Sequence, residues 1–408
     1  MYSKELVSAV AAFSLVSGAA ALSCKDDPVE INSQADATQV ASCKSITNDL
    51  VLNVNAGPSI DIGGVLTSIG GSFIVKNNGF IQSLSSESLQ TIGGVFQLNN
   101  VTSLASLVFP VLGEVGSIDW ATLSSLQEPT FGTPGITKAK SVTVADTFVA
   151  NLDGINVQEL TDMDINNNRR LSKFSTSIKS LSNVLRVSAN ALNMTMEMPN
   201  LEWIANMTIA NVSTFSVPSL KAVNGSMRFN SNYFTEFLAA NLTTIQDGDL
   251  SFVSNPQLTN ITIPKLEKVG GGVTIANNTA LGKINGLDSL ADVGGAIVMR
   301  GSFDDIELPS LNNVVGTADF ISTEDIQSSC DKLNKLSGNV VQGKVTTCES
   351  DNATANNNTS SGGSDSGSGS GSNSSGGDNG DSAASLASVS MSTVVTLAAL
   401  GGLVTAFL

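Results

Sequence analysis

The feature that most constrains the fold is a repeat of about 22 residues that runs through the middle of the chain. Its clearest copy, residues 263–278, ends in a segment where apolar Val273 and Ile275 flank polar Thr274, the alternation of a half-buried β-strand. Such segments begin at Asp49, Ser72, Val95, Ser117, Ser141, Asp162, Val184, Asn206, Ser226, Asp249, Gly272, Ala296 and Thr317. Successive starts are 20 to 24 residues apart, which is the spacing of β-helical and leucine-rich solenoids.

Two positions of every predicted strand are apolar. The second residue is Leu50, Phe73, Phe96, Ile118, Val142, Met163, Leu185, Met207, Met227, Leu250, Val273, Ile297 or Ala318, and the fourth is Leu52, Val75, Leu98, Trp120, Val144, Ile165, Val187, Ile209, Phe229, Phe252, Ile275, Met299 or Phe320. A solenoid presents the same face at the same place in each coil, so these columns predict one continuous core. We therefore predict an all-β fold, a right-handed β-helix or leucine-rich-repeat-like solenoid of about thirteen coils over residues 49–323.

A second signature marks the corner before each strand. Seven of the twelve junctions carry an aliphatic residue six positions and another three positions before the next strand, as Leu266 and Val269 do. A glycine usually follows, as Gly270 does, and we expect it to adopt a positive φ at the turn. The signature is lost in residues 128–140, which contain two prolines; this stretch is either a binding loop or drift of the repeat.

Charge and composition remove several function classes. The net charge is -16 with a sequence pI near 4.3, and no basic cluster interrupts this balance, so a nucleic-acid partner is not expected. The chain has no histidine, which excludes histidine general bases, Ser-His triads and histidine-ligated metal sites. We expect no metal and no cofactor.

Residues 1–21 have the pattern of a secretory signal peptide. Lys4 precedes an apolar run from Leu6 to Val16, and small residues follow, with cleavage expected after Ala19 or Ala21. The alternative, a membrane anchor, is weak because the apolar run is too short to span a bilayer. The sequence therefore predicts a secreted chain.

Four cysteines flank the repeats, two at each end, in a compartment that permits disulfides. Pairing Cys24 with Cys43 and Cys330 with Cys348 joins neighbours, whereas the crossed pairings would join opposite ends of a solenoid. Metal ligation is the weaker alternative, since no CxxC spacing accompanies the cysteines. We predict an N-terminal disulfide cap over 22–48 and a helical disulfide cap over 324–349, with Ser322 and Thr323 as candidates for its helix N-cap.

The composition changes sharply after Cys348. Residues 350–380 are rich in Gly, Ser and Asn, and we predict a flexible linker there. Residues 381–408 follow the pattern of a GPI-attachment signal that is removed, with Gly380 as the attachment residue and Asn379 and Ser382 as neighbouring possibilities. A transmembrane anchor in the terminal apolar stretch is the alternative, disfavoured because flanking basic residues are missing.

Asn-x-Ser/Thr triplets make twelve candidate N-glycosylation sites: Asn100, Asn193, Asn206, Asn211, Asn224, Asn241, Asn260, Asn277, Asn352, Asn357, Asn358 and Asn373. This number is a modest excess over chance. Asparagines also recur near strand ends, at Asn77, Asn78, Asn167, Asn168, Asn190, Asn232, Asn255 and Asn278. For these we favour a structural role, a stack that hydrogen-bonds the turns of successive coils.

The sharpest catalytic candidates are paired carboxylates, because β-helical enzymes that cleave polysaccharides need two carboxyls at a defined separation. The pairs are Asp162 with Asp164, Asp247 with Asp249, and Asp304 with Asp305. We favour solvated strand and turn acids instead, with Asp164 forming an ion pair with Arg186 of the next coil. Trp203 and Tyr233 are the aromatic residues left to stack on a sugar, although either is equally well explained as the edge of the core.

The combination of a signal peptide, cysteine pairs at both ends, coils such as Ile263-Pro-Lys-Leu-Glu-Lys-Val-Gly followed by Val-Thr-Ile-Ala-Asn-Asn, a Ser/Gly linker and a GPI-type tail resembles the fungal receptor L-domain-like cell-wall organisation proteins. The resemblance implies a non-enzymatic glycoprotein, anchored by a GPI lipid in the plasma membrane and found in the cell wall, that supports wall integrity and morphogenesis. The implied partners are wall polysaccharide or wall glycoproteins. The alternative is a receptor or adhesin that binds glycans through one face of the solenoid.

Overall fold

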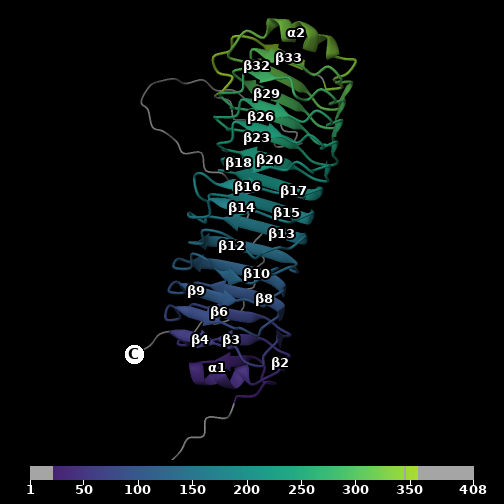
Figure 1. Cartoon of the computed structure of the whole chain (residues 1–408). Helices are drawn as coiled ribbons and strands as arrows, with labels where there is room; N and C mark the ends of the chain where they lie inside the picture. The colour runs from purple at the N-terminus through teal and green to yellow at the C-terminus, as the bar shows by residue number, and fades with distance from the viewer. Residues whose placement is uncertain (1–21, 344–345, 357–408) are drawn as a thin grey trace, which may run out of the picture. The chain divides into compact units, whose positions relative to one another are not determined.

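The computed structural model describes residues 22–343 and 346–356. These residues form a parallel β-solenoid with a short helix at each end, α1 (Gln34–Ala41) and α2 (Gln327–Leu333), as Figure 1 shows. The predicted signal peptide and GPI signal, most of the predicted linker, and Gly380 lie outside the described residues. The same is true of the candidate glycosylation sites Asn357, Asn358 and Asn373.

All thirteen predicted strands are present and form the longest side of the solenoid, here called the long side. They are β3 (Leu50–Leu52), β6 (Phe73–Lys76), β8 (Thr91–Asn99), β10 (Glu114–Leu123), β12 (Ser141–Thr147), β13 (Glu159–Asn166), β15 (Ser180–Ser188), β17 (Trp203–Ala210), β20 (Met227–Asn230), β23 (Leu250–Val253), β26 (Val273–Ala276), β29 (Ile297–Gly301) and β32 (Ala318–Ser322). Each pairs in parallel with the next, so that Phe229, Phe252 and Ile275 lie one above another. No side chain of the two apolar columns is more than 1% exposed, which confirms the predicted core.

Two further sides close each coil. The second side contains β2 (Ser45–Ile46), β5 (Ser68–Ile69), β19 (Ala222–Val223), β22 (Thr244–Ile245), β25 (Lys268–Val269), β28 (Asp292–Val293) and β31 (Asn313–Val314), together with the first residues of several long-side strands. The third side contains β4 (Ser59–Asp61), β7 (Ser83–Ser85), β9 (Ser106–Phe109), β11 (Thr130–Phe131), β14 (Lys173–Ser175), β16 (Thr195–Glu197), β18 (Thr214–Ser216), β21 (Glu236–Leu238), β24 (Asn260–Thr262), β27 (Lys283–Ile284) and β30 (Asp305–Ile306). The third side is divided into four separate sheets, whereas the other two sides form one continuous sheet.

The corner glycines are explained by close packing rather than by turn geometry. The predicted positive φ is wrong, because the described glycines with positive φ are Gly57, Gly135, Gly154 and Gly338, none of them at the corner signature. A Cβ built on Gly270 would lie 1.7 Å from the carbonyl oxygen of Gln246 in the preceding coil. Neighbouring coils therefore approach too closely at this corner for a larger residue.

The turn after each long-side strand has its own regular conformation. In ten successive coils the sixth residue of the repeat has a φ between 51° and 59°; these residues are Asn77, Asn100, Thr122, Asp146, Asn167, Ala189, Asn211, Ser231, Ser254 and Asn277. The seventh residue points inward. Where it is asparagine, it continues a buried ladder: Asn232 Nδ2 donates to the Ile209 carbonyl at 2.9 Å and to Asn255 Oδ1 at 3.0 Å. Asn255 bonds Asn278 in the same way, so the predicted asparagine stack is confirmed for this inner set.

Each end of the solenoid carries one more strand and a disulfide. At the N-terminal end β1 (Val29–Ile31) pairs with β3, and at the C-terminal end β33 (Thr346–Glu349) pairs with β32. The predicted pairings are confirmed, with Cα atoms 5.8 Å apart for Cys24 and Cys43 and 5.5 Å apart for Cys330 and Cys348.

The C-terminal helix begins later than predicted. Ser322 is the last residue of β32, where its hydroxyl donates to the Phe303 carbonyl, so it is not available to cap α2. The residue before the helix is Ile326, which makes no side-chain cap, and a short 3-10 helix, Asn334–Leu336, follows α2. No helix among the described residues has the length and apolar character that crossing a bilayer requires.

Candidate functional site

Four of the six paired carboxylates accept hydrogen bonds within the coils or between them, whereas those of Asp247 and Asp304 accept none from another described residue. Asp249 Oδ1 accepts from the backbone N–H of Gly272 in the next coil at 2.9 Å, and its other oxygen faces Arg228. Asp305 accepts from the Ser329 hydroxyl at 3.0 Å, and Asp164 accepts from the Asn166 amide at 2.7 Å. Asp162 accepts from the Asn183 amide of the next coil. Asp162, Asp249 and Asp305 thus bond a neighbouring coil or the C-terminal cap, and Asp164 bonds its own strand, whereas the sequence predicts acids that are only solvated.

The ion pair predicted between Asp164 and Arg186 is not formed. The two residues are opposite each other in the β13–β15 ladder, but they are not among the ion pairs within 4 Å of the described residues. Those pairs are Lys138–Glu114, Lys221–Glu202, Arg228–Asp249 and Arg300–Asp319. Asp164 instead bonds the Asn166 amide on its own strand, and this local partner takes the place of the more distant arginine.

The Lys221–Glu202 pair lies on the second side, between two neighbouring coils. The Lys221 ammonium donates a hydrogen bond to Glu202 at 2.8 Å and holds the pKa of this carboxyl below its usual value. Both side chains are more than half exposed, so the pair is a solvated surface contact rather than part of an active site. Within residues 22–343 and 346–356, no group of three or more Cys, Asp or Glu side chains is arranged to hold a metal ion.

The two candidate sugar-stacking aromatics belong to different parts of the coil. Trp203 begins β17 on the second side, is half-buried, and donates its indole N–H to Asn224 Oδ1 at 3.1 Å. Tyr233 lies in the turn after β20, where its backbone N–H donates to the Val212 carbonyl. The structure does not bring them together, and stacking of either on a sugar remains a prediction.

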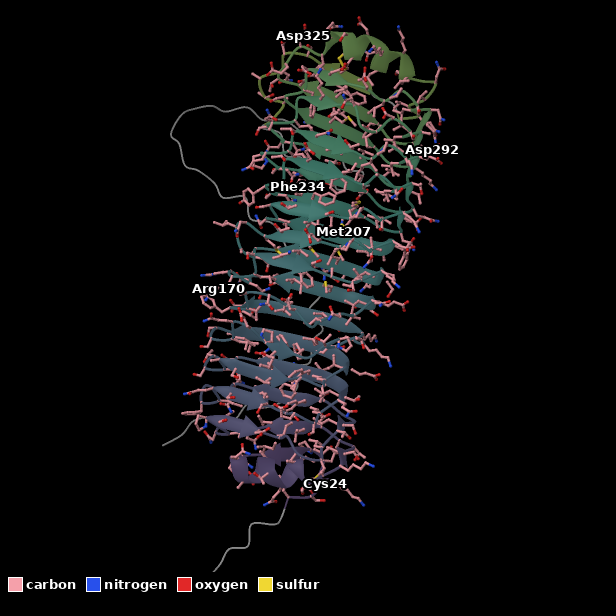
Figure 2. The ribbon with its side chains drawn as sticks, viewed as in Figure 1. Cys24, Arg170, Met207, Phe234, Asp292 and Asp325 are labelled. Atoms are coloured by element: carbon pink, nitrogen blue, oxygen red, sulfur yellow. A yellow bond between two sulfur atoms is a disulfide. The ribbon has the colours of Figure 1, made fainter. Side chains whose placement is uncertain are left out.

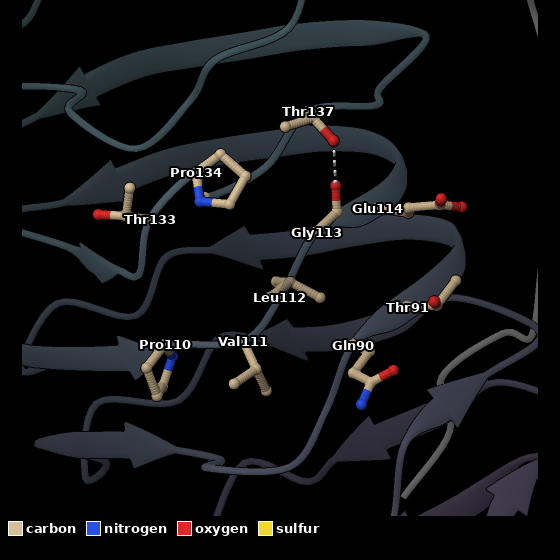
Figure 3. A pocket seen from close by; sticks show the side chains of 11 residues that line it. Gln90, Thr91, Pro110, Val111, Leu112, Gly113, Glu114, Thr133, Pro134 and Thr137 are labelled. Atoms are coloured by element: carbon tan, nitrogen blue, oxygen red, sulfur yellow. Dashed lines mark hydrogen bonds between the residues drawn. The ribbon is translucent and has the colours of Figure 1, made fainter.

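An open groove of about 450 Å³ lies where the third side turns toward the second side (Figure 3). One wall comes from Gln90, Thr91 and Glu114 at the starts of β8 and β10, and the floor from the loop Pro110 to Gly113. The other wall is formed by Thr133, Pro134 and Thr137, which belong to the irregular stretch 128–140. The structure thus places this stretch beside a concave surface.

The groove has both polar and apolar surface and carries little free charge. Pro110, Val111 and Pro134 give it an apolar surface, and Val111 is 45% exposed. Thr137 offers a hydroxyl, which also donates to the Gly113 carbonyl at 3.4 Å, while the carboxylate of Glu114 is paired with Lys138. Apolar faces beside hydroxyl and amide groups suit an uncharged ligand rich in hydroxyl groups.

Sequence reasoning singled out only one wall of this groove. Gln90 and Thr91 occupy ordinary repeat positions, and nothing in the sequence pattern distinguishes them from the same positions in other coils.

A second opening, of about 330 Å³, lies on the third side where β18 and β21 are neighbours but do not pair. Thr214, Ser216, Pro218, Glu236 and Leu238 line it. Figure 2 shows Phe234, which also lines it, on the same edge of the solenoid as Arg170.

Nine candidate glycosylation sites fall within the described residues, and their side chains differ in what they bond. The amide Nδ2 donates to another described residue in Asn100, Asn206, Asn211, Asn241, Asn277 and Asn352. Asn206 is the most constrained, because its Oδ1 also accepts from the Ser226 N–H of the next coil. Asn193, Asn224 and Asn260 are exposed, and their Nδ2 groups donate no hydrogen bond to another described residue.

The chain matches no family model and no solved structure, but it has clear relatives. Protein ecm33 of Aspergillus fumigatus is 34% identical over 76% of this chain and 76% of that protein. Cell surface GPI-anchored protein of Arthroderma benhamiae is 35% identical over 84% of this chain and 86% of that protein. Sporulation-specific protein 2 of Saccharomyces cerevisiae is 33% identical over 76% of this chain, which spans 62% of that relative. With this identity over most of its length, the chain belongs to the fungal Ecm33 family.

Proposed function

We propose that the protein is a non-enzymatic cell-surface glycoprotein that organises the fungal cell wall and supports its integrity and morphogenesis. Two relatives are named a cell surface GPI-anchored protein and a cell wall protein, and their names include no reaction. The observation that carries the proposal is the use of the carboxylates: Asp162, Asp249 and Asp305 each bond a neighbouring coil or cap residue. Carboxyls that maintain the fold in this way are poorly placed to act as an acid and base pair.

The proposal includes the way the protein is held at the surface. The signal peptide at 1–21 directs the chain into the secretory pathway, and GPI attachment at Gly380 follows removal of 381–408. The linker 350–380 separates the solenoid from the lipid. The localisation that follows is the outer leaflet of the plasma membrane and the cell wall.

The proposed partner is wall polysaccharide or a wall glycoprotein, contacted at the groove beside Val111 and Pro134. This choice is supported by the apolar surface beside hydroxyl and amide groups and by the pairing of Glu114 with Lys138, which leaves little charge to attract an ion. An uncharged polymer with hydroxyl groups and apolar ring faces matches this combination of surface groups. A dedicated glycan receptor is the alternative, but no observation favours it over a wall-organising role.

The test is complementation of a fungal strain that lacks this gene. The variant combines Asp162→Asn, Asp164→Asn, Asp247→Asn and Asp304→Asn, which remove at least one carboxylate from each of the three candidate pairs and preserve side-chain shape. We expect it to restore wall composition and resistance to wall-perturbing drugs as fully as the natural chain. If the variant is folded and present at the surface in normal amounts but restores nothing, the protein uses these carboxyls chemically and the non-enzymatic proposal is wrong.

A further inference from the structure

The indole of Trp203 and the side chain of Asn224 form a contact that the repeat does not require. Trp203 is opposite Ala222 in the β17–β19 ladder, which brings Asn224, two residues further on, beside the indole. The indole N–H donates to Asn224 Oδ1 at 3.1 Å, across two neighbouring coils. Trp203 is half-buried and Asn224 is exposed, so this polar contact lies at the surface.

Asn224 begins the triplet Asn-Gly-Ser, which is an acceptor for N-linked glycans. Its Oδ1 is held by the indole, whereas its Nδ2 donates no hydrogen bond to another described residue. Asn206, also in an acceptor triplet, provides the contrast, because its Nδ2 donates to Asn183 and its Oδ1 accepts from Ser226. A glycan on Asn206 would compete with contacts between coils, whereas a glycan on Asn224 displaces none of those observed.

Glycan transfer preserves the contact with the indole. The Nδ2–C1 bond forms as the C1–O bond to the lipid pyrophosphate of the oligosaccharide donor breaks, and one Nδ2 proton is lost to base. The carbonyl oxygen remains an acceptor for Trp203. The product is a secondary amide, which strongly prefers the trans arrangement, and this places C1 of the first sugar on the same side as Oδ1. The sugar is therefore directed toward the indole rather than away from it.

We propose that Asn224 carries an N-linked glycan and that Trp203 is the surface on which its first N-acetylglucosamine packs. The partly exposed indole offers an apolar face, and the C–H groups of a sugar ring cover such a face while its hydroxyls stay in water. The inference requires entry into the secretory pathway and in that respect rests on the proposed signal peptide. It explains why a tryptophan stands at a position of the second side where the paired strands of other coils have serine, threonine, alanine, asparagine or a charged residue, and no other aromatic residue.

Tryptophan fluorescence tests the proposal, because the chain has two tryptophans and the other, Trp120, is fully buried. Quenching by acrylamide therefore reports on Trp203. In protein from a host that attaches N-glycans, we expect Asn224→Gln to raise the quenching constant. The natural chain made without N-glycans should show the same rise, which separates loss of the sugar from loss of the asparagine. Trimming with an endoglycosidase that leaves one N-acetylglucosamine should cause no rise, since the first sugar makes the contact.

Asn260→Gln is the matched control, because Asn260 is also exposed and in an acceptor triplet but bonds Thr262 rather than an aromatic ring. It should leave the quenching unchanged.

A second measurement is the NMR spectrum of the trimmed protein. Protons of the sugar on Asn224 should be shifted upfield by the indole ring, and they should lose this shift in Trp203→Leu. An unmodified Asn224 peptide beside a glycosylated Asn260 peptide would overturn the inference and leave the secretory route intact. A glycosylated Asn224 with unchanged quenching and unshifted sugar protons would overturn the role of Trp203.

Discussion

At the scale of single residues, the direction in which a side chain points decides its effect on stability. Phe252 is fully buried and stacks on Phe229 of the preceding coil, with ring centroids 4.7 Å apart. Thr274 is in the next strand with its side chain on the outer face. Phe252→Asp places an unpaired charge inside the core, and we expect it to lower the free energy of unfolding by more than about 4 kcal/mol. Chemical denaturation measures the change.

Thr274→Asp introduces the same charge one position from the inner column of the neighbouring coil and provides the control. It should change the free energy of unfolding by less than about 1 kcal/mol, because the carboxylate stays in water. Equal losses in the two variants would mean that the inner and outer faces of the long side have been exchanged. Successive side chains of a strand point to opposite faces, so each residue faces either the core or the solvent.

At the scale of elements, the sequence predicts the strands that every coil repeats and misses features that depend on a single coil or on how coils stack. The long-side strands were predictable because every coil must place apolar residues at the second and fourth positions of the repeat, as Leu250 and Phe252 are placed. The start of α2 was not, because Ser322 has the chemistry of a helix cap but completes β32 instead. The role of Gly270 was also missed, since the distance to Gln246 depends on how coils stack and not on local propensity.

The candidate site shows the same limit, because a groove is assembled from residues about 20 positions apart. The prediction for this groove concerns Val111, which is 45% exposed on its floor. Val111→Asp places a carboxylate where we propose that an uncharged polymer lies, and we expect binding to insoluble wall glucan to fall by about tenfold or more. Co-sedimentation of the purified protein with the polysaccharide measures the loss.

Val315→Asp is the control for the groove, since Val315 is 50% exposed and lies near the other end of the solenoid, outside both described openings. It should sediment with the glucan as the natural protein does. If both variants bind glucan as strongly as the natural protein does, the groove is not the contact surface. A parallel loss in both would show that added negative charge alone weakens binding, and the placement of the partner beside Val111 and Pro134 would then be wrong.

At the scale of the whole molecule, function depends on what holds the solenoid at the surface. If Gly380 is the attachment residue, small side chains are required there and at the neighbouring Asn379 and Ser382. Replacing all three with tryptophan should abolish attachment, and the protein should be lost from the cell surface. The same substitution at Gly362, Gly367 and Ser370, within the predicted linker, should not. Surface labelling of intact cells distinguishes the two variants.

The chemistry of the anchor gives the decisive measurement. A phospholipase specific for phosphatidylinositol should release the natural protein from membranes, because it cleaves the only proposed link to the lipid. If the lipid has been trimmed and the remnant joined to wall polysaccharide, glucanase should release the protein instead. Either result supports an anchor at the C-terminal end of the linker. Recovery of an intact Leu408 C-terminus in the membrane-bound protein would contradict it, because attachment at Gly380 removes residues 381–408 before the chain reaches the surface.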